Sequence, residues 1–162
     1  MRKVFFSFHY KRDIQRVSIV RNSWRFRQKG EATPFLDRAE WEQLKRRGED
    51  AVKRWINSQL TGSTVTVVLI GKETGSRKWV NYEIERSYVL GHGMLGIYLN
   101  NIPDFFGTTE SACLNPFSNW YIENDSRRTN FSEMYPVYDW VKDNGFLNFA
   151  NWVEQAARKA GK

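Results

Sequence analysis

Glu83 and Glu85 lie two positions apart in the segment SRKWVNYEIERSYVLG (76–91), and one of them could serve as a catalytic carboxylate. The spacing of Val80 and Ile84 predicts a helix whose apolar side faces a core. Glu83 then lies at the edge of the buried stripe, whereas Glu85 faces solvent. A carboxylate in a cleft can stabilise positive charge that develops on a substrate. Glu83 is therefore the better candidate, although most glutamates on helices are only surface charges.

The elements that must position such a carboxylate begin with short apolar runs. Val, Ile, Phe and Thr dominate these runs without clean alternation, which is typical of strands buried on both faces. Their starts are about thirty residues apart, the length of one strand–helix–strand repeat. The predicted strands are 3–9, 33–37, 63–71 and 94–100, and a further short run covers 135–141.

Between these runs, apolar residues recur at helical spacing. Gly91 stands where a helix would end on a left-handed residue. The predicted helices are 14–24, 52–60, 80–88 and, near the end of the chain, 146–157. Alternating strands and helices with right-handed crossovers predict an α/β fold, with a parallel sheet of about five strands covered on both faces.

The length of 162 residues predicts a single domain over 1–162, with an irregular insertion at about 101–134. This insertion is rich in Asn, Ser, Thr, Asp, Gly and Pro, yet it contains several aromatic residues. It could be a surface excursion pinned by its aromatics or a lid, and the first reading is preferred.

Composition narrows the function classes. Hydrophobic residues make up 41% and aromatic residues 15%, as expected for a packed globular protein. Cys113 is the single cysteine, so no disulfide within the chain is possible. No stretch resembles a signal peptide or a membrane span. We therefore expect a cytoplasmic protein without a membrane partner. The net charge of +7 favours phosphate-bearing ligands. No zinc-finger spacing, RNA-recognition signature or basic stripe is present, so nucleic acid is not an expected partner.

Several segments match or partly match known functional motifs, but the residues or elements around them do not fit those functions. GHGMLG (91–96) matches the dinucleotide pattern GxGxxG, but it follows a helix and enters a strand, the reverse of what phosphate binding requires. No P-loop is present. Asp37 ends a predicted strand but lacks the neighbouring acidic pair of a phospho-receiver. Two histidines and one cysteine give no metal-ligand spacing, so no metal site is expected.

Three loops should converge at the carboxyl end of the parallel sheet, where such folds bind ligands. They are FHYKRD (8–13), DRAEW (37–41) and GKETGSRKW (71–79). The third loop leads into the helix that carries Glu83, so we expect that carboxylate near the cleft.

The segments VFFSFHYKRD (4–13) and INSQLTGSTVTVVLIGKETGSRKWVNYEI (56–84) resemble TIR domains. More closely, the chain is similar to the TIR-like proteins of the bacterial Thoeris anti-phage defence system. The resemblance also includes RNSW (21–24), GIYLN (96–100) and YDWV (138–141), and it is weakest over 101–134. It implies a flavodoxin-like, TIR-like three-layer sandwich.

The resemblance also implies an activity. Thoeris TIR-like proteins are NAD+ glycohydrolase or ADP-ribosyl cyclase type enzymes, which turn NAD+ into a cyclic ADP-ribose isomer on phage infection. That second messenger activates a partner effector. The family's catalytic glutamate follows a tryptophan by four residues, which is Glu83 after Trp79. NAD+ is then a substrate, so no cofactor is implied. A phage-derived trigger and self-association are further expected partners.

Substrate contacts follow as hypotheses. Tyr10 and Trp41 suit base stacking, and Ser7 and His9 could contact ribose or phosphate. Arg77, near a helix N-terminus together with Lys78, could hold phosphate.

Each of these residues also has a structural alternative. Ser7 could cap the end of the first strand, and Asp13 could be the N-cap of the first helix. Trp79, a further substrate-binding candidate, could instead pack against the sheet, and Trp41 and Trp55 could be ordinary core.

Two other functions remain open at this point. A TIR-like interaction module, or adaptor, would assemble with a partner without any chemistry. A nucleoside deoxyribosyltransferase-like enzyme would share the architecture and a catalytic Glu, but NAD+ would be inert to it. Incubation with NAD+ separates both from the leading hypothesis.

Overall fold

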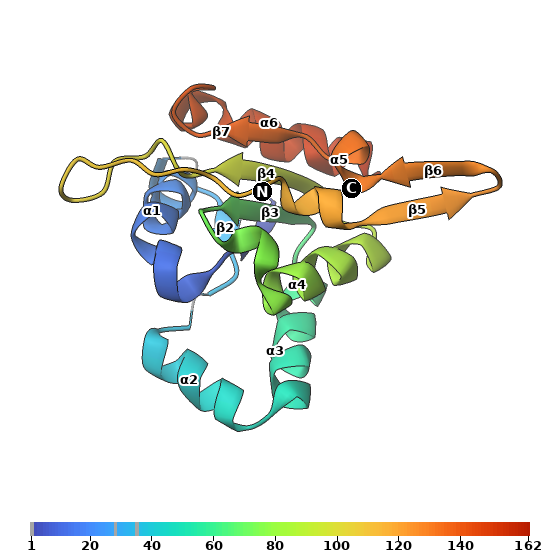
Figure 1. The fold of residues 1–162 in the computed structure, drawn as a ribbon, viewed down its shortest axis with the longest axis horizontal. Helices are drawn as coiled ribbons and strands as arrows, with labels where there is room; N and C mark the ends of the chain where they lie inside the picture. Colours follow the sequence, from blue (N-terminus) through green and yellow to red (C-terminus); the bar gives the residue numbers. More distant parts are fainter. Residues whose placement is uncertain (1, 28, 35) are drawn as a thin grey trace.

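A five-stranded parallel sheet forms the centre of the molecule, with the strand order β2-β1-β3-β4-β7 (Figure 1). The computed structural model describes residues 2–27, 29–34 and 36–162. The strands of the sheet are β1 (Lys3–Ser7), β2 (Glu31–Ala32), β3 (Val65–Ile70), β4 (Gly93–Tyr98) and β7 (Val137–Asp139). The expected α/β sandwich with a parallel sheet of five strands is therefore confirmed.

The helices cover both faces of this sheet. The longer helices are α1 (Tyr10–Asn22), α2 (Arg38–Arg46), α3 (Glu49–Thr61), α4 (Lys78–Val89) and α6 (Gly145–Lys159). Shorter helical segments are η1 (Ser23–Arg27), η2 (Thr74–Ser76), η3 (Pro116–Asn119) and α5 (Phe131–Met134).

Side chains that alternate along the strands divide the core into two layers. On one face, Val4 and Val67 pack with Val17 of α1 and Phe149 of α6. On the other face, the apolar stripes of α3 and α4 cover the sheet. All six residues of β3 are buried, as expected for the central strand of a parallel sheet.

The direction of chain travel reverses between β1 and β3, because the chain first builds outward to β2 and then returns. In parallel α/β folds such a switch point leaves a crevice beyond the carboxyl ends of the two strands. The loops after β1 and β3 therefore border the natural ligand site of this sheet.

Two local predictions are wrong. The second strand is not 33–37: it is the short edge strand Glu31–Ala32, followed by Thr33, whose amide still bonds to the carbonyl of Val4 at 3.0 Å. Pro34 has no amide hydrogen to continue the pairing, and residue 35 lies outside the described residues. Asp13 is not a helix N-cap, since α1 begins at Tyr10. As predicted, Gly91 follows the end of α4 and has a positive φ of 69°.

Residues 101–134 contain an extended loop, η3, α5 and a hairpin of β5 (Tyr121–Asn124) and β6 (Arg127–Asn130), none of which the sequence predicted. Phe117 and Phe131 anchor this region, because both are buried against α4 and the adjoining strands. Figure 1 shows the hairpin extending away from the sheet. Among the described residues, no helix is both long and apolar enough to cross a bilayer.

Candidate active site

A cavity of about 360 Å³ opens beside the carboxyl end of β1. The end of β1 and the start of α1 form one wall, and the segment after β2 together with α2 and α3 forms another. The first two turns of α4 close the third side. The lining residues are Phe5, Phe6, Phe8, His9, Tyr10, Lys11, Thr33, Pro34, Leu36, Arg38, Trp41, Glu42, Lys45, Trp55, Arg77, Lys78, Trp79, Val80 and Glu83.

Glu83 lines this cavity from the second turn of α4 and is 8% exposed. The Ser7 hydroxyl, at the end of β1, donates a hydrogen bond to the Glu83 carboxyl group. Val80 and Ile84 are buried in the core beside it, and Glu85 is exposed on the opposite side of α4. The helical geometry inferred from the sequence for these four residues is therefore confirmed.

Burial raises the pKa of Glu83 to about 8, and the hydrogen bond from Ser7 offsets part of this effect. The carboxyl group is consequently mostly protonated at neutral pH when the cavity holds no charge. A cation placed beside it would lower this pKa and favour the carboxylate. The Glu83 carboxyl group therefore suits a ligand that carries or develops positive charge, because that charge would favour the ionised carboxylate.

Aromatic side chains surround the cavity in pairs. The ring centroids of Phe8 and Tyr10 lie 5.7 Å apart, and those of Trp41 and Trp55 lie 6.3 Å apart. Trp79 packs edge-on against a tyrosine of α4 and also lines the cavity. The candidates Tyr10, Trp41 and Trp79 are therefore brought together on the lining of one cavity, where aromatic rings suit a planar ligand.

Basic groups lie around the same opening. Arg77, the residue before α4, lines the cavity and pairs with Glu73 at 2.9 Å. Lys78, the first residue of α4, pairs with Glu49. His9 also lines the cavity, and its pKa is lowered first by burial and then by the charge of Arg77. The lowered pKa favours the neutral imidazole, which can both donate and accept a hydrogen bond.

Ser7 differs from the other candidates. Its side chain is fully buried, and it lies behind Glu83 rather than on the lining of the cavity. The hydroxyl neither caps the strand end nor faces the opening. Its observed partner is the Glu83 carboxyl group, so its role is to hold that group.

Sequence reasoning missed α2, which supplies Trp41 to the site. The signal was present, because Asp37 and Glu40 form a reciprocal capping box at the start of this helix. The Asp37 side chain accepts from the Glu40 amide at 2.8 Å, and the Glu40 side chain accepts from the Asp37 amide at 2.7 Å. Asp37 is therefore a helix cap.

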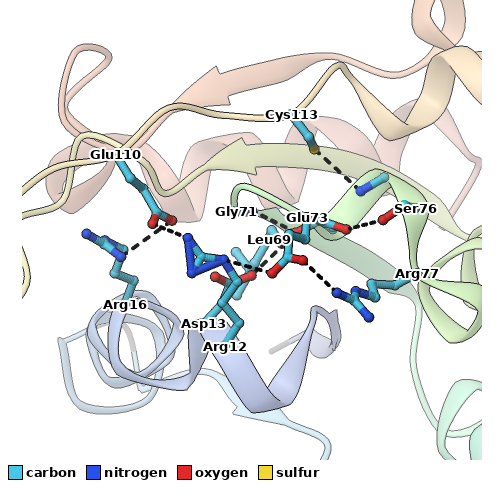
Figure 2. A network of polar contacts seen from close by, with 12 residues as sticks. Arg12, Asp13, Arg16, Leu69, Gly71, Glu73, Ser76, Arg77, Glu110 and Cys113 are labelled. Atoms are coloured by element: carbon cyan, nitrogen blue, oxygen red, sulfur yellow. Dashed lines mark hydrogen bonds and ion pairs between the residues drawn. The ribbon is translucent and has the colours of Figure 1, made fainter.

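A polar network next to the cavity was also missed (Figure 2). Arg12 bridges Glu73 and Glu110, with its Nε 3.2 Å from Glu73, and Arg16 lies 3.5 Å from Glu110. Glu73 also holds Arg77. The network therefore links the loop after β4 to α1, and α1 to the loop that leads into α4.

Asp13 is buried beneath this network, where its carboxylate lies against Gly71 just after β3. Burial, and then the charge of Glu110, raise the pKa of Asp13 to about 6. A Cβ atom at position 71 would lie 2.3 Å from an Asp13 oxygen, so this approach requires glycine. Gly71 therefore allows the chain to pass directly beside the Asp13 carboxyl group as it leaves β3.

No group of three or more His, Cys, Asp and Glu side chains is arranged to hold a metal ion within the described part of the chain.

Comparisons with known proteins show which sequences this chain resembles. Residues 5–104 match the family model described as "Thoeris protein ThsB, TIR-like domain". The chain is also 35% identical, over an alignment of 189 residues, to a Bacillus cereus (strain MSX-D12) protein named "Putative cyclic ADP-D-ribose synthase ThsB1". That alignment covers 94% of this chain and 98% of the Bacillus protein. The similarity thus spans nearly the full length of both proteins.

Proposed function

The chain belongs to the Thoeris ThsB family of TIR-like proteins, as its sequence led us to expect, and on this premise we propose that it cleaves NAD+ and forms a cyclic ADP-ribose isomer. The proposal is supported by the name of the Bacillus relative and by the site itself. The observation that carries it is the buried Glu83 carboxyl group, held by Ser7 inside a cavity with aromatic walls and a basic rim.

Glu83 is the proposed catalytic residue. When nicotinamide leaves NAD+, it takes the electron pair of its bond to the ribose, and positive charge develops on the ribose ring. The Glu83 carboxylate beside that ring would stabilise the charge. Nicotinamide is already a cationic leaving group, so no second carboxylic acid is required, and the cation itself would favour ionisation of Glu83.

Cyclisation requires that another atom of the same ADP-ribose attack the ribose carbon, forming the new bond and releasing a proton. A ligand held folded in a water-excluding site favours that attack over attack by water. The cavity volume of about 360 Å³ is within the range of small-ligand sites. Tyr10, Trp41 and Trp79 would stack the bases, His9 would contact ribose or phosphate, and Arg77 would hold phosphate.

Ser7 would act as a positioning residue, because it lies behind Glu83 and its hydrogen bond fixes the orientation of the carboxylate. The product would serve as a second messenger for an effector protein, with a phage-derived trigger controlling its formation. These two partners follow from the family premise.

The test is chromatography of NAD+ after incubation with the wild-type protein, Glu83→Gln and the control Glu85→Gln. The same comparison is made in lysates of phage-infected cells that express each protein. We expect nicotinamide and a cyclic product from wild type and Glu85→Gln, and neither from Glu83→Gln. If wild type is inert in both settings, the adaptor reading replaces the enzyme. If Glu83→Gln is fully active, Glu83 has no part in the reaction.

A further inference from the structure

Charged side chains of alternating sign form a line that ends at the candidate cavity (Figure 2). In order, the line consists of Arg16, Glu110, Arg12, Glu73 and Arg77. Its inner end is fixed, because Arg16 is buried and also donates to the carbonyl group of Ile102 at 2.7 Å. Its outer end is Arg77, which lines the cavity. The line holds one more cation than carboxylate, so its excess positive charge can serve an anion at the cavity.

Glu73 is held by two arginines at once. Its Oε1 accepts a hydrogen bond from the Arg77 guanidinium at 2.9 Å, and its Oε2 lies 3.2 Å from Nε of Arg12. Arg12 is in turn held from its other side by Glu110. If Arg77 turned to another partner, Glu73 would therefore still have a cation beside it. The exchange would avoid the cost of leaving a charge unpaired.

The other paired cations on the cavity lining differ in this respect. Lys45 pairs with Glu42 at 3.0 Å, and Lys78 pairs with Glu49. Within residues 2–27, 29–34 and 36–162, neither of these carboxylates forms an ion pair with a second cation. An anion that took either lysine would leave a lone carboxylate nearby, and the two negative charges would repel each other. Arg77 is therefore the paired cation that can be transferred to an anionic ligand at the lowest cost.

The position of Arg77 also favours an anion beside it. Arg77 is the N-cap residue of α4, and the first turn of that helix contains no acidic residue. The N-terminus of a helix carries partial positive charge, which favours a neighbouring anion. Burial and then the charge of Arg77 lower the pKa of His9, whereas the charge of Glu73 raises it. The outer end of the line therefore acts electrostatically on a group that lines the cavity.

We infer that Glu73 is a positioning residue, which holds Arg77 in the free protein and transfers it to a diphosphate group when a dinucleotide binds. Arg12 then keeps the Glu73 carboxylate paired. Only ion pairs are exchanged, so no proton or covalent bond moves. A ligand without phosphate offers Arg77 no alternative partner, so the exchange selects for ligands that carry phosphate. This inference rests on the proposed function, because NAD+ is the ligand that would bring a diphosphate group into the cavity.

Isothermal titration calorimetry with ADP-ribose tests whether Glu73 acts through Arg77. Glu73→Gln removes the competing carboxylate, so we expect the Kd for ADP-ribose to fall by about 2- to 5-fold, the size of a partly exposed ion pair. In an Arg77→Gln background, the same substitution should leave the Kd unchanged. Equal tightening in both backgrounds would show that Glu73 acts only as a general negative charge, and would overturn the inference. A wild-type protein that does not bind ADP-ribose would overturn it as well.

The double variant Arg12→Gln/Glu73→Gln tests the part played by Arg12. Arg12→Gln alone should raise the Kd for ADP-ribose by about 2- to 5-fold, because Glu73 could then release Arg77 only by losing its last partner. The double variant should bind as tightly as Glu73→Gln. If the two charges acted independently, their opposite effects would cancel and the double variant would match wild type, which would contradict the inference.

Lys72→Gln is the matched control for these charge changes. Lys72 is exposed next to Glu73 and lies outside the cavity lining, so its loss should change the Kd by less than about twofold. The first experiment leaves Arg12 intact, so it can overturn the inference even if Arg12→Gln fails to fold. Neither experiment requires turnover of NAD+. The coupling between Glu73 and Arg77 can hold in a protein that leaves NAD+ intact, and NAD+ cleavage can occur without the coupling, so the two failures are distinguishable.

Discussion

The hydroxyl of Ser7 donates a hydrogen bond to the carboxyl group of Glu83, although the two residues are 76 positions apart in the sequence. The bond joins the end of β1 to the second turn of α4. Glu83 lines the candidate cavity, and Ser7 lies behind it. Because both side chains are buried, water does not compete for this contact.

Removal of the Ser7 hydroxyl should impair catalysis through Glu83. In Ser7→Ala the carboxylate loses a hydrogen bond that favours its charged form, so the pKa of Glu83 rises further. We expect kcat to fall by about 10- to 150-fold, as for a lost bond to a charged group worth roughly 1.5–3 kcal/mol. The pH profile of kcat should shift toward higher pH.

Ser87→Ala is the matched control for this prediction. Ser87 is also buried on α4, but its hydroxyl donates to the backbone carbonyl of Glu83 at 2.7 Å and not to the carboxyl group. Its pH profile should match that of wild type. An unshifted profile in Ser7→Ala would show that the bond does not tune the carboxyl group.

Burial of Glu83 should make stability depend on pH. The pKa of Glu83 is raised from 4.5 to about 8 on folding, so its contribution to stability is complete below pH 4.5 and is lost as pH rises through 8. Glu83→Gln cannot ionise and does not suffer this loss. As the pH rises from 5 to 9, the free energy of unfolding of the variant should therefore increase by up to about 4 kcal/mol relative to that of wild type.

Thermal unfolding of wild type and Glu83→Gln at pH 5, 7 and 9 measures this difference. The Tm of the variant should exceed that of wild type by an amount that grows with pH. Glu85→Gln, an exposed change on the same helix, should show no such trend. A constant difference in Tm would mean that Glu83 titrates normally in the folded protein.

Trp41 should contribute to substrate binding through its ring. Stacking of a base on an aromatic side chain is worth about 1–3 kcal/mol, so Trp41→Ala should raise KM for NAD+ by about 5- to 150-fold. Trp41→Phe retains a ring and should recover much of this loss. Because Trp41 also packs on Trp55, the Tm of both variants must be measured alongside. Unchanged KM in a folded Trp41→Ala protein would remove Trp41 from the site.

The contact between Asp13 and Gly71 should make position 71 intolerant of a side chain. Gly71→Ala would place a Cβ atom 2.3 Å from an Asp13 oxygen, so we expect destabilisation of about 2–4 kcal/mol in urea unfolding. Gly62→Ala, whose nearest neighbouring atom would be 3.4 Å away, should change stability far less. Adding Asp13→Ala should relieve part of the Gly71→Ala defect. Equal effects of the two glycine substitutions would contradict the proposed close approach.

The layered architecture and the position of Glu83 on its helix could be predicted from the residue pattern alone. Both depend on periodicity, since buried runs of β-branched residues indicate parallel strands and the spacing of Val80 and Ile84 fixes the faces of α4. The capping signal of Asp37 and Glu40 would also have predicted α2 if it had been used.

The way in which these elements meet became visible only in the folded arrangement of the chain. The Ser7–Glu83 bond and the placement of Asp13 against Gly71 depend on contacts between segments far apart in the chain. Local patterns cannot specify such contacts, because they arise when crossovers bring strand ends together. The raised pKa of Glu83 has the same origin: a carboxyl group acquires it only when packing removes water from around it.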